Sequence, residues 1–215
     1  MNAWIEPLMV ILVMVNLGLL SVRRMAGCIR LAGMQGALLG LAILALAPGG
    51  DPEPHVWFLA AAVVGIKALA FPALLRRTMR TLHLRAWVEP YIGYGLSLLT
   101  ALAALLFSLW LGSRLAIPGL SLPPLLFPAA FTAFFGGLTM LVSRKKALTQ
   151  VVGFLAMENG IFLFGAPTLA WGSAWMELAV LLDVFVAVFV MGLVVHRIDR
   201  TFDSIDVGLF CSLRD

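Results

Sequence analysis

Three ionisable residues lie in the middle of long apolar stretches, which places them where a bilayer would exclude a charge. They are Lys67, Glu158 and Asp183. A charged side chain at the bilayer centre costs about 2.5–3.5 kcal/mol on insertion scales, so such a residue is a functional candidate. A carboxylic acid and an amine in a low dielectric can both exchange protons near neutral pH, because burial disfavours their charged forms. These residue types at this depth predict a proton relay.

Polar neighbours of these residues are secondary candidates for the same path: Gln35, Asn159 and Glu177. Gln35 and Asn16 are uncharged and suit a hydrogen bond between two helices. Glu177 lies near a predicted helix end, where contact with water favours a structural role. For the three buried charges, the alternative is that they pair with each other or with neighbouring subunits and only hold helices together.

Membrane-spanning helices must position these residues, as the composition shows. The chain has 215 residues, of which 62% are hydrophobic and 12% charged, whereas soluble domains are about 45–50% apolar and about 25% charged. This excludes an ordinary soluble enzyme, a disordered tail and a nucleic-acid binder. A membrane helix needs about 20 apolar residues. The sequence predicts an all-α polytopic membrane protein with seven transmembrane helices, at 4–21, 28–48, 55–75, 89–112, 122–142, 147–166 and 173–196.

The basic residues predict the orientation of these spans. Of the 15 Lys and Arg residues, all but Lys67 and Arg114 fall after the first, third, fifth or seventh span or near the chain end. The other loops are acidic or nearly uncharged. The positive-inside rule then places the N-terminus outside and the C-terminus inside. The basic pI near 9.6 therefore reflects topology and requires no polyanionic partner.

A weak internal duplication divides the chain. Ser21-Val22-Arg23-Arg24 resembles Ser143-Arg144-Lys145-Lys146, and Met34-Gln35-Gly36 resembles Met157-Glu158-Asn159. Helices 1–3 then repeat helices 5–7, as in many transport folds, and Gln35 takes the position of Glu158; chance similarity between apolar helices is the competing interpretation. The predicted regions are an N-terminal four-helix region (1–121), a three-helix region (122–200) and a cytoplasmic tail (201–215).

Glycine and proline positions predict local features of the helices. Gly153 and Gly160 lie on one helix face, where they allow a neighbouring helix to approach closely. Pro72 removes a backbone donor and predicts a kink one turn after Lys67. Glu89-Pro90 and Leu122-Pro123-Pro124 predict helix starts.

Nothing in the sequence predicts catalysis by this chain alone. It has no nucleophile–base pair, no Gly-rich phosphate loop, no Cys cluster for iron–sulfur and no intramembrane His pair for haem. Cys28 and Cys211 are too far apart in the sequence to form a metal motif. We therefore expect a non-catalytic chain without a cofactor or metal of its own.

The segment from Gly153 to Gly160, followed by a central acid in the next helix, resembles the NuoK subunit of respiratory complex I and the C subunit of Mrp-type antiporters. The whole chain is more similar to the hydrogenase-4 component E family (HyfE). The residues that carry this similarity are Ile29-Arg30-Leu31 with Gln35, Met157-Glu158-Asn159-Gly160 and His196-Arg197-Ile198-Asp199-Arg200-Thr201-Phe202. The chain departs from the NuoK pattern in two ways: Glu158 lies one turn later, with Leu155 at the NuoK position, and the second acid is Asp183 instead of Glu.

The resemblance implies a multi-pass subunit of a membrane-bound group 4 NiFe hydrogenase complex in a prokaryotic cytoplasmic (inner) membrane. Such a subunit would help to couple electron transfer in its partners to proton or sodium translocation. The NiFe centre and the iron–sulfur clusters would belong to hydrophilic partner subunits, and antiporter-like subunits would be its membrane partners. Two alternatives stay open: a structural scaffold that links antiporter-like subunits, and a small-solute transporter.

Overall fold

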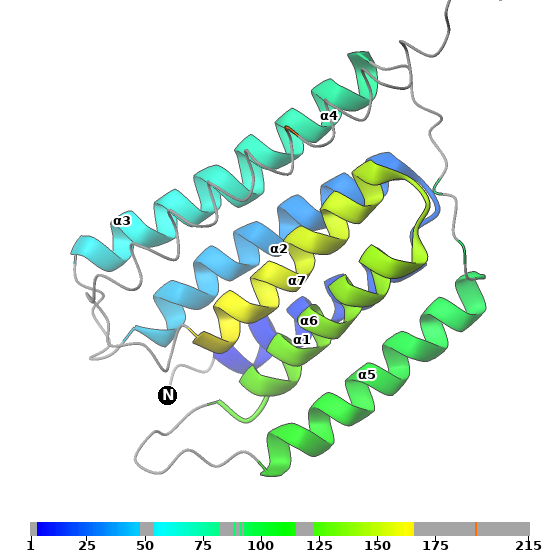
Figure 1. Ribbon diagram of the computed structural model, residues 1–215. Coiled ribbons are helices and arrows are strands. Elements are labelled where there is room, and N and C mark those ends of the chain that lie inside the picture. Colours follow the sequence, from blue (N-terminus) through cyan, green and yellow to red (C-terminus); the bar gives the residue numbers. More distant parts are fainter. Residues whose placement is uncertain are drawn as a thin grey trace, which may run out of the picture.

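The computed structural model describes residues 4–47, 54–81, 88, 91, 93–114, 123–165 and 192. The elements that these residues form are all helical (Figure 1). They are α1 (Ile5–Ser21), α2 (Met25–Leu46), α3 (Pro54–Val63), the π-helix η1 (Val64–Ala70), α4 (Phe71–Thr81), α5 (Tyr94–Arg114), α6 (Leu126–Ser143) and α7 (Ala147–Gly165). The predicted all-α class is confirmed for this part of the chain.

Five helices are long and apolar enough to cross a membrane, and α3, η1 and α4 together make one of them. The other four are α2, α5, α6 and α7, while α1 is apolar but has only 17 residues. The predicted seventh span (173–196) and the tail (201–215) lie outside the described residues, apart from Gly192. The count of seven spans and the orientation in the membrane therefore stay predictions.

Helices α1, α2, α6 and α7 form the centre of the bundle (Figure 1). The continuous helix α3–η1–α4 packs on α2 along one side, and α5 packs on α6 and α1 along the other. α5 exposes large apolar side chains, Leu99 and Leu106 among them. A face of this kind suits lipid.

Two helical hairpins in the structure share the same register. A three-residue turn joins α1 to α2 and another joins α6 to α7. Ser21 and Ser143 end the first helix of each hairpin, and Met25 and Ala147 begin the second, with an offset of 122 residues at both positions. This agreement supports the predicted repeat for the first two helices of each triplet.

Glycines allow α6 and α7 to pack with their backbones in close approach. A Cβ atom on Gly137 would lie 2.5 Å from the carbonyl oxygen of Gly153 and 2.7 Å from the Cα of Met157. One on Gly160 would lie 2.6 Å from the carbonyl oxygen of Ala130. The small-residue face predicted for Gly153 and Gly160 is therefore confirmed.

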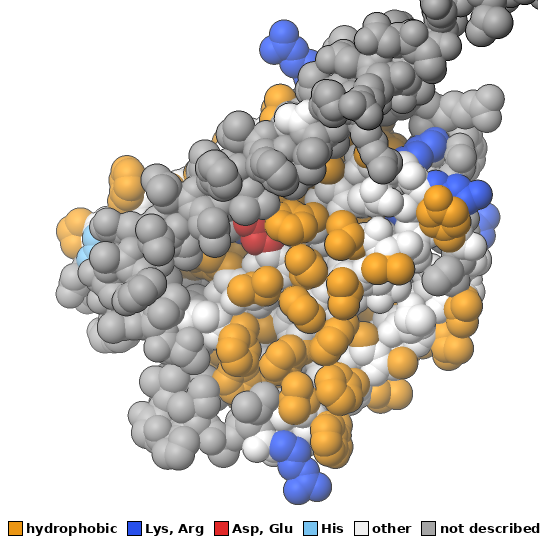
Figure 2. Space-filling view, in the orientation of Figure 1, with side chains coloured by type: hydrophobic (Ala, Val, Ile, Leu, Met, Phe, Trp, Pro, Cys, Tyr) orange, Lys and Arg blue, Asp and Glu red, His pale blue; other side chains and the backbone are white. Residues whose placement is uncertain are grey.

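The two described turns that carry basic residues, 22–24 and 144–146, lie at one end of the bundle, which we call the basic end. The N–H of Val88 donates to the carbonyl oxygen of Arg23 (2.8 Å), and the N–H of Tyr91 donates to that of Ser143 (2.8 Å). The Lys145 ammonium lies 5.0 Å from the centre of the Tyr91 ring. Figure 2 shows most of the visible Lys and Arg side chains gathered toward this end. The charge asymmetry seen in the sequence is thus a property of the fold.

Arg144 is a buried residue that links the two hairpins at the basic end. It is fully buried, its Nη2 donates to the carbonyl oxygen of Leu20 over 2.7 Å, and its own carbonyl oxygen accepts from Nε2 of Gln150 over 2.9 Å. The helix end of α1 is therefore capped by a side chain from the α6–α7 turn. This contact ties the two hairpins together where both of them turn.

We expect Arg144→Met to destabilise the protein, because a hydrogen bond from a charged donor contributes about 1.5–3 kcal/mol. The matched control is Lys145→Met, which removes an adjacent exposed charge and its contact with the Tyr91 ring and should change stability by no more than about 1 kcal/mol. The measurement is the thermal unfolding midpoint of the purified protein in detergent. Equal midpoints for the two variants would show that the hydrogen bond of the Arg144 side chain contributes nothing to stability.

Candidate functional site

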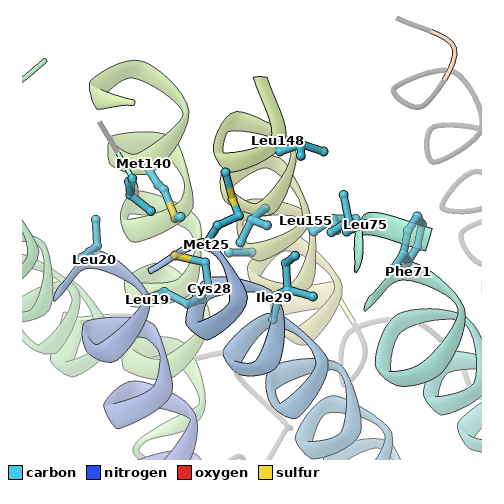
Figure 3. Packing of buried hydrophobic residues seen from close by; sticks show 14 of the residues in the cluster. Leu19, Leu20, Met25, Cys28, Ile29, Phe71, Leu75, Met140, Leu148 and Leu155 are labelled. Carbon is cyan, nitrogen blue, oxygen red and sulfur yellow. The ribbon is translucent and has the colours of Figure 1, made fainter. Parts of the chain in front are cut away.

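Buried polar side chains form a layer between two apolar clusters of the bundle. The basic-end cluster contains Leu19, Met25, Ile29, Phe71, Leu75, Met140, Leu148 and Leu155 among others (Figure 3). The opposite cluster contains Met9, Leu12, Leu39, Ile43, Val63, Leu126 and Leu163 among others. Between the two clusters along the helices lie the residues of the polar layer: Asn16 of α1, Gln35 of α2, Lys67 of η1, Thr132 of α6, and Glu158 and Asn159 of α7.

The structure brings together two of the three predicted relay residues. Lys67 Nζ lies 3.8 Å from Oε2 of Glu158, and the two side chains are only 3% and 13% exposed. Lys67 Nζ also lies 5.5 Å from the centre of the Phe162 ring, a cation–π contact. Helices η1 and α7 therefore place an acid and a base against each other at the middle of the bundle. Phe162 is a site residue that the sequence analysis did not single out.

The π-helix explains how Lys67 is presented. Pro72 has no N–H, so the carbonyl oxygen of Ala68 cannot receive the usual helical hydrogen bond. The N–H of Phe71 donates to the carbonyl oxygen of Ile66, five residues back. The structure thus has a seven-residue π-helix directly ahead of Pro72, where the sequence predicts a kink. Such segments are frequent at functional sites.

Glycines of α2 bring its backbone against Lys67. A Cβ atom on Gly36 would lie 2.7 Å from the carbonyl carbon and from the Cβ of Lys67, and one on Gly33 would lie 2.9 Å from Cγ of Pro72. The sequence signal was available in the spacing of Gly33, Gly36 and Gly40. Side chains at these positions would push η1 away from α2.

The two hairpins also give an offset for the repeat. The helix bounds of both hairpins agree at an offset of 122 residues, which makes Gly36 the counterpart of Glu158. The sequence prediction pairs Glu158 with Gln35 instead, at an offset of 123 residues. Nε2 of Gln35 instead donates to Oδ1 of Asn16 over 2.8 Å, which confirms the predicted hydrogen bond between α1 and α2.

A small cavity lies beside the ion pair. Its volume is about 10 Å³, about the space that one water molecule needs. Asn159, which is 5% exposed, lines it, and its Oδ1 has no hydrogen-bond partner among the described residues. The lining residues are Ala32, Lys67, Phe71, Pro72, Leu75, Leu155 and Asn159.

Two predicted site residues, Asp183 and Glu177, lie outside the described residues. The part of the chain that the structure describes contains no group of three His, Cys, Asp or Glu side chains that could hold a metal ion. Cys28 is a buried free thiol of the basic-end cluster. The chemistry available in the described site is therefore that of the Lys67–Glu158 pair and the neutral amides around it.

The pair can hold and release protons at a fixed depth. The Glu158 carboxylate can accept a proton and the Lys67 ammonium can release one. A change in either charge alters the electrostatic energy of the other, since the interaction is strong in a low dielectric. The two groups can therefore act as one coupled proton-binding unit.

Comparison with known proteins gives a match over most of the chain and shorter matches over part of it. The chain is 29% identical over 196 residues to the uncharacterized protein Rv0085 of Mycobacterium tuberculosis, a match that spans 90% of this chain and 88% of that protein. It is 37% identical over 82 residues to hydrogenase-4 component E of Escherichia coli K12 and to that of Shigella flexneri. No family model and no solved structure matches. The chain is thus similar to hydrogenase-4 component E over 38% of its own length and 38% of the length of that protein.

Proposed function

We propose that this chain is a membrane subunit of a respiratory-type hydrogenase complex and contributes to ion translocation coupled to electron transfer in partner subunits. The observation that carries the proposal is the buried ion pair of Lys67 and Glu158 inside the polar layer. The partial similarity to hydrogenase-4 component E supports the class of complex. Protons are the favoured ion, because a carboxylate can take up a proton and an ammonium group can release one, and sodium is the alternative.

In this proposal Glu158 is a proton-relay carboxylate and Lys67 controls its charge. A proton that reaches Glu158 neutralises the carboxylate and removes the attraction that stabilises the Lys67 ammonium. Asp183 is proposed as the second relay carboxylate, while Gln35, Asn159 and Glu177 are proposed as polar groups along the same path.

The chemistry of electron transfer belongs to the partners in this proposal. A NiFe centre and iron–sulfur clusters would sit in hydrophilic subunits, and antiporter-like subunits would flank this chain in a prokaryotic inner membrane. The basic end would face the cytoplasm, by the positive-inside rule.

A structural scaffold is the second candidate, and one observation favours it. The Lys67–Glu158 pair joins η1 to α7, so its loss would also loosen the bundle. A small-solute transporter is less favoured, because the cavity beside the pair is about the size of one water molecule.

We expect the affinity-tagged chain, purified from its own membranes in mild detergent, to carry other proteins with it. These should be a NiFe large subunit, iron–sulfur proteins and antiporter-like membrane subunits, identified by mass spectrometry of one native-gel band. The control is an unrelated polytopic membrane protein with the same tag. Recovery of the chain by itself, as a ligand-responsive monomer, would overturn the hydrogenase assignment and favour transport.

A further inference from the structure

The cavity beside the ion pair lies on one side of the polar layer only. Phe71 and Leu75 come after Lys67 along the helix, Leu155 comes before Asn159, and Ala32 comes before Gln35. All four of these apolar lining residues belong to the basic-end cluster. None of the seven residues that line the cavity belongs to the opposite cluster. The free space therefore lies on the basic-end side of Lys67 and Asn159.

The polar groups at this cavity suit a water molecule. Oδ1 of Asn159 can accept a hydrogen bond from water, and the Lys67 ammonium can donate one to it. The Nζ–Oε2 distance of 3.8 Å is longer than a direct hydrogen bond, and Lys67 is the member of the pair that lines the cavity. Two polar partners and space for about one molecule meet the requirements of an internal water site.

Among the described residues, apolar groups pack on the opposite side of the pair. The Phe162 ring lies 5.5 Å from Lys67 Nζ and is a member of the opposite cluster. Val63, one turn before Lys67, is 1% exposed, and Leu163, one turn after Asn159, is 2% exposed. The described residues that we name on this side are therefore apolar and offer no side-chain polar groups to hold water.

We infer that an internal water site between α2, α4 and α7 connects the Lys67–Glu158 pair to the basic end of the bundle, whereas the opposite cluster seals the pair from the other end. This inference rests on the proton relay proposed above and adds the end of the bundle from which water and protons reach it. By the positive-inside rule that side is the cytoplasm.

Matched cysteines on either side of the layer test this inference. Phe71→Cys and Val63→Cys lie four residues after and before Lys67, and Leu155→Cys and Leu163→Cys lie four residues before and after Asn159. All four positions are buried. Each single cysteine is placed in the full-length chain, in its native membranes, with Cys28 and Cys211 replaced by alanine.

The probe is Ag⁺, which is close to water in size and binds a thiol with release of its proton. Protection from a maleimide that is added after denaturation reports the reaction. We expect Ag⁺ added from the basic side to modify Phe71→Cys on the order of tenfold faster than Val63→Cys, and Leu155→Cys faster than Leu163→Cys by a similar factor. The reason is that a thiol reacts where water reaches it and is inert in apolar packing. Ala32→Val, which adds volume to the cavity lining, should slow modification of Leu155→Cys, whereas Ala42→Val of the opposite cluster should not.

Equal rates within each pair, or faster reaction from the opposite side, would overturn the inference. Assembly of each variant is checked on native gels. The two cysteine pairs lie on different helices, so if a variant of one pair assembles poorly, the other pair still tests the inference. The readout does not depend on hydrogenase turnover. If modification is one-sided but variants of Lys67 and Glu158 pump ions normally, the water site is supported and the relay proposal is rejected.

Discussion

Glu158→Gln is expected to abolish ion translocation while leaving the hydrogenase chemistry of the partner subunits in place. The substitution keeps the size of the side chain but removes the group that binds the proton. It also leaves the Lys67 ammonium buried without its ion pair, which typically costs about 3–5 kcal/mol. We therefore expect a lower yield of assembled complex as well. Proton movement in inverted membrane vesicles and the yield on native gels measure the two effects separately.

The double variant Lys67→Met/Glu158→Gln separates a relay from a scaffold. Replacing both members of a buried pair with well-packed hydrophobic residues of similar volume is often neutral or stabilising. The double variant likewise leaves no unpaired charge, so assembly should recover in it. A relay predicts that translocation stays lost in that assembled complex. A scaffold predicts that translocation returns with assembly. Glu6→Gln, at the exposed start of α1, is the control and should leave both properties unchanged.

Gly137→Ala is expected to have the largest effect on stability of any single methyl addition in the α6–α7 hairpin. The new Cβ would meet the backbone of Gly153 and Met157 at 2.5–2.7 Å, and a backbone cannot move aside as a flexible side chain can. Overpacking of this kind costs about 1–3 kcal/mol. The resulting separation of α6 and α7 should also displace Glu158 from Lys67.

Gly136→Ala is the matched control for this prediction. Its Cβ would meet only Cδ1 of Leu20, at 3.4 Å, and alanine favours a helix over glycine by about 1 kcal/mol. We expect Gly136→Ala to be neutral or stabilising and Gly137→Ala to be destabilising, measured as the thermal unfolding midpoint in detergent. Equal effects at these adjacent positions would show that helix propensity, and not close backbone packing, determines the result.

The depth of the buried charges could be predicted from the sequence, because apolar runs and basic turns define each span. Lys67 and Glu158 both fall in the polar layer for this reason. Their contact could not be predicted, since it depends on which helices pack together and at what height. The repeat offered a guide to matching positions, but its offset is 122 residues at the turns and 123 at the Met residues.

Local helix geometry was the least predictable feature. The missing N–H of Pro72 permits a kink or a π-helix. The structure has the π-helix η1, and Gly33 and Gly36 of α2 pack against η1 and Pro72. Helix α5 begins at Tyr94, whereas Glu89-Pro90 predicts an earlier start. The N–H of Tyr91 is bound to the carbonyl oxygen of Ser143, a tertiary contact that no local pattern reveals.

The central claim is that the Lys67–Glu158 pair carries protons for a hydrogenase complex. The most direct test is the number of protons moved per hydrogen molecule turned over, in inverted vesicles that contain the Lys67→Met/Glu158→Gln complex. Native gels must first show that this complex is assembled to the wild-type extent. The proposal predicts continued hydrogenase turnover with a proton ratio near zero. A wild-type ratio in the assembled double variant would contradict it.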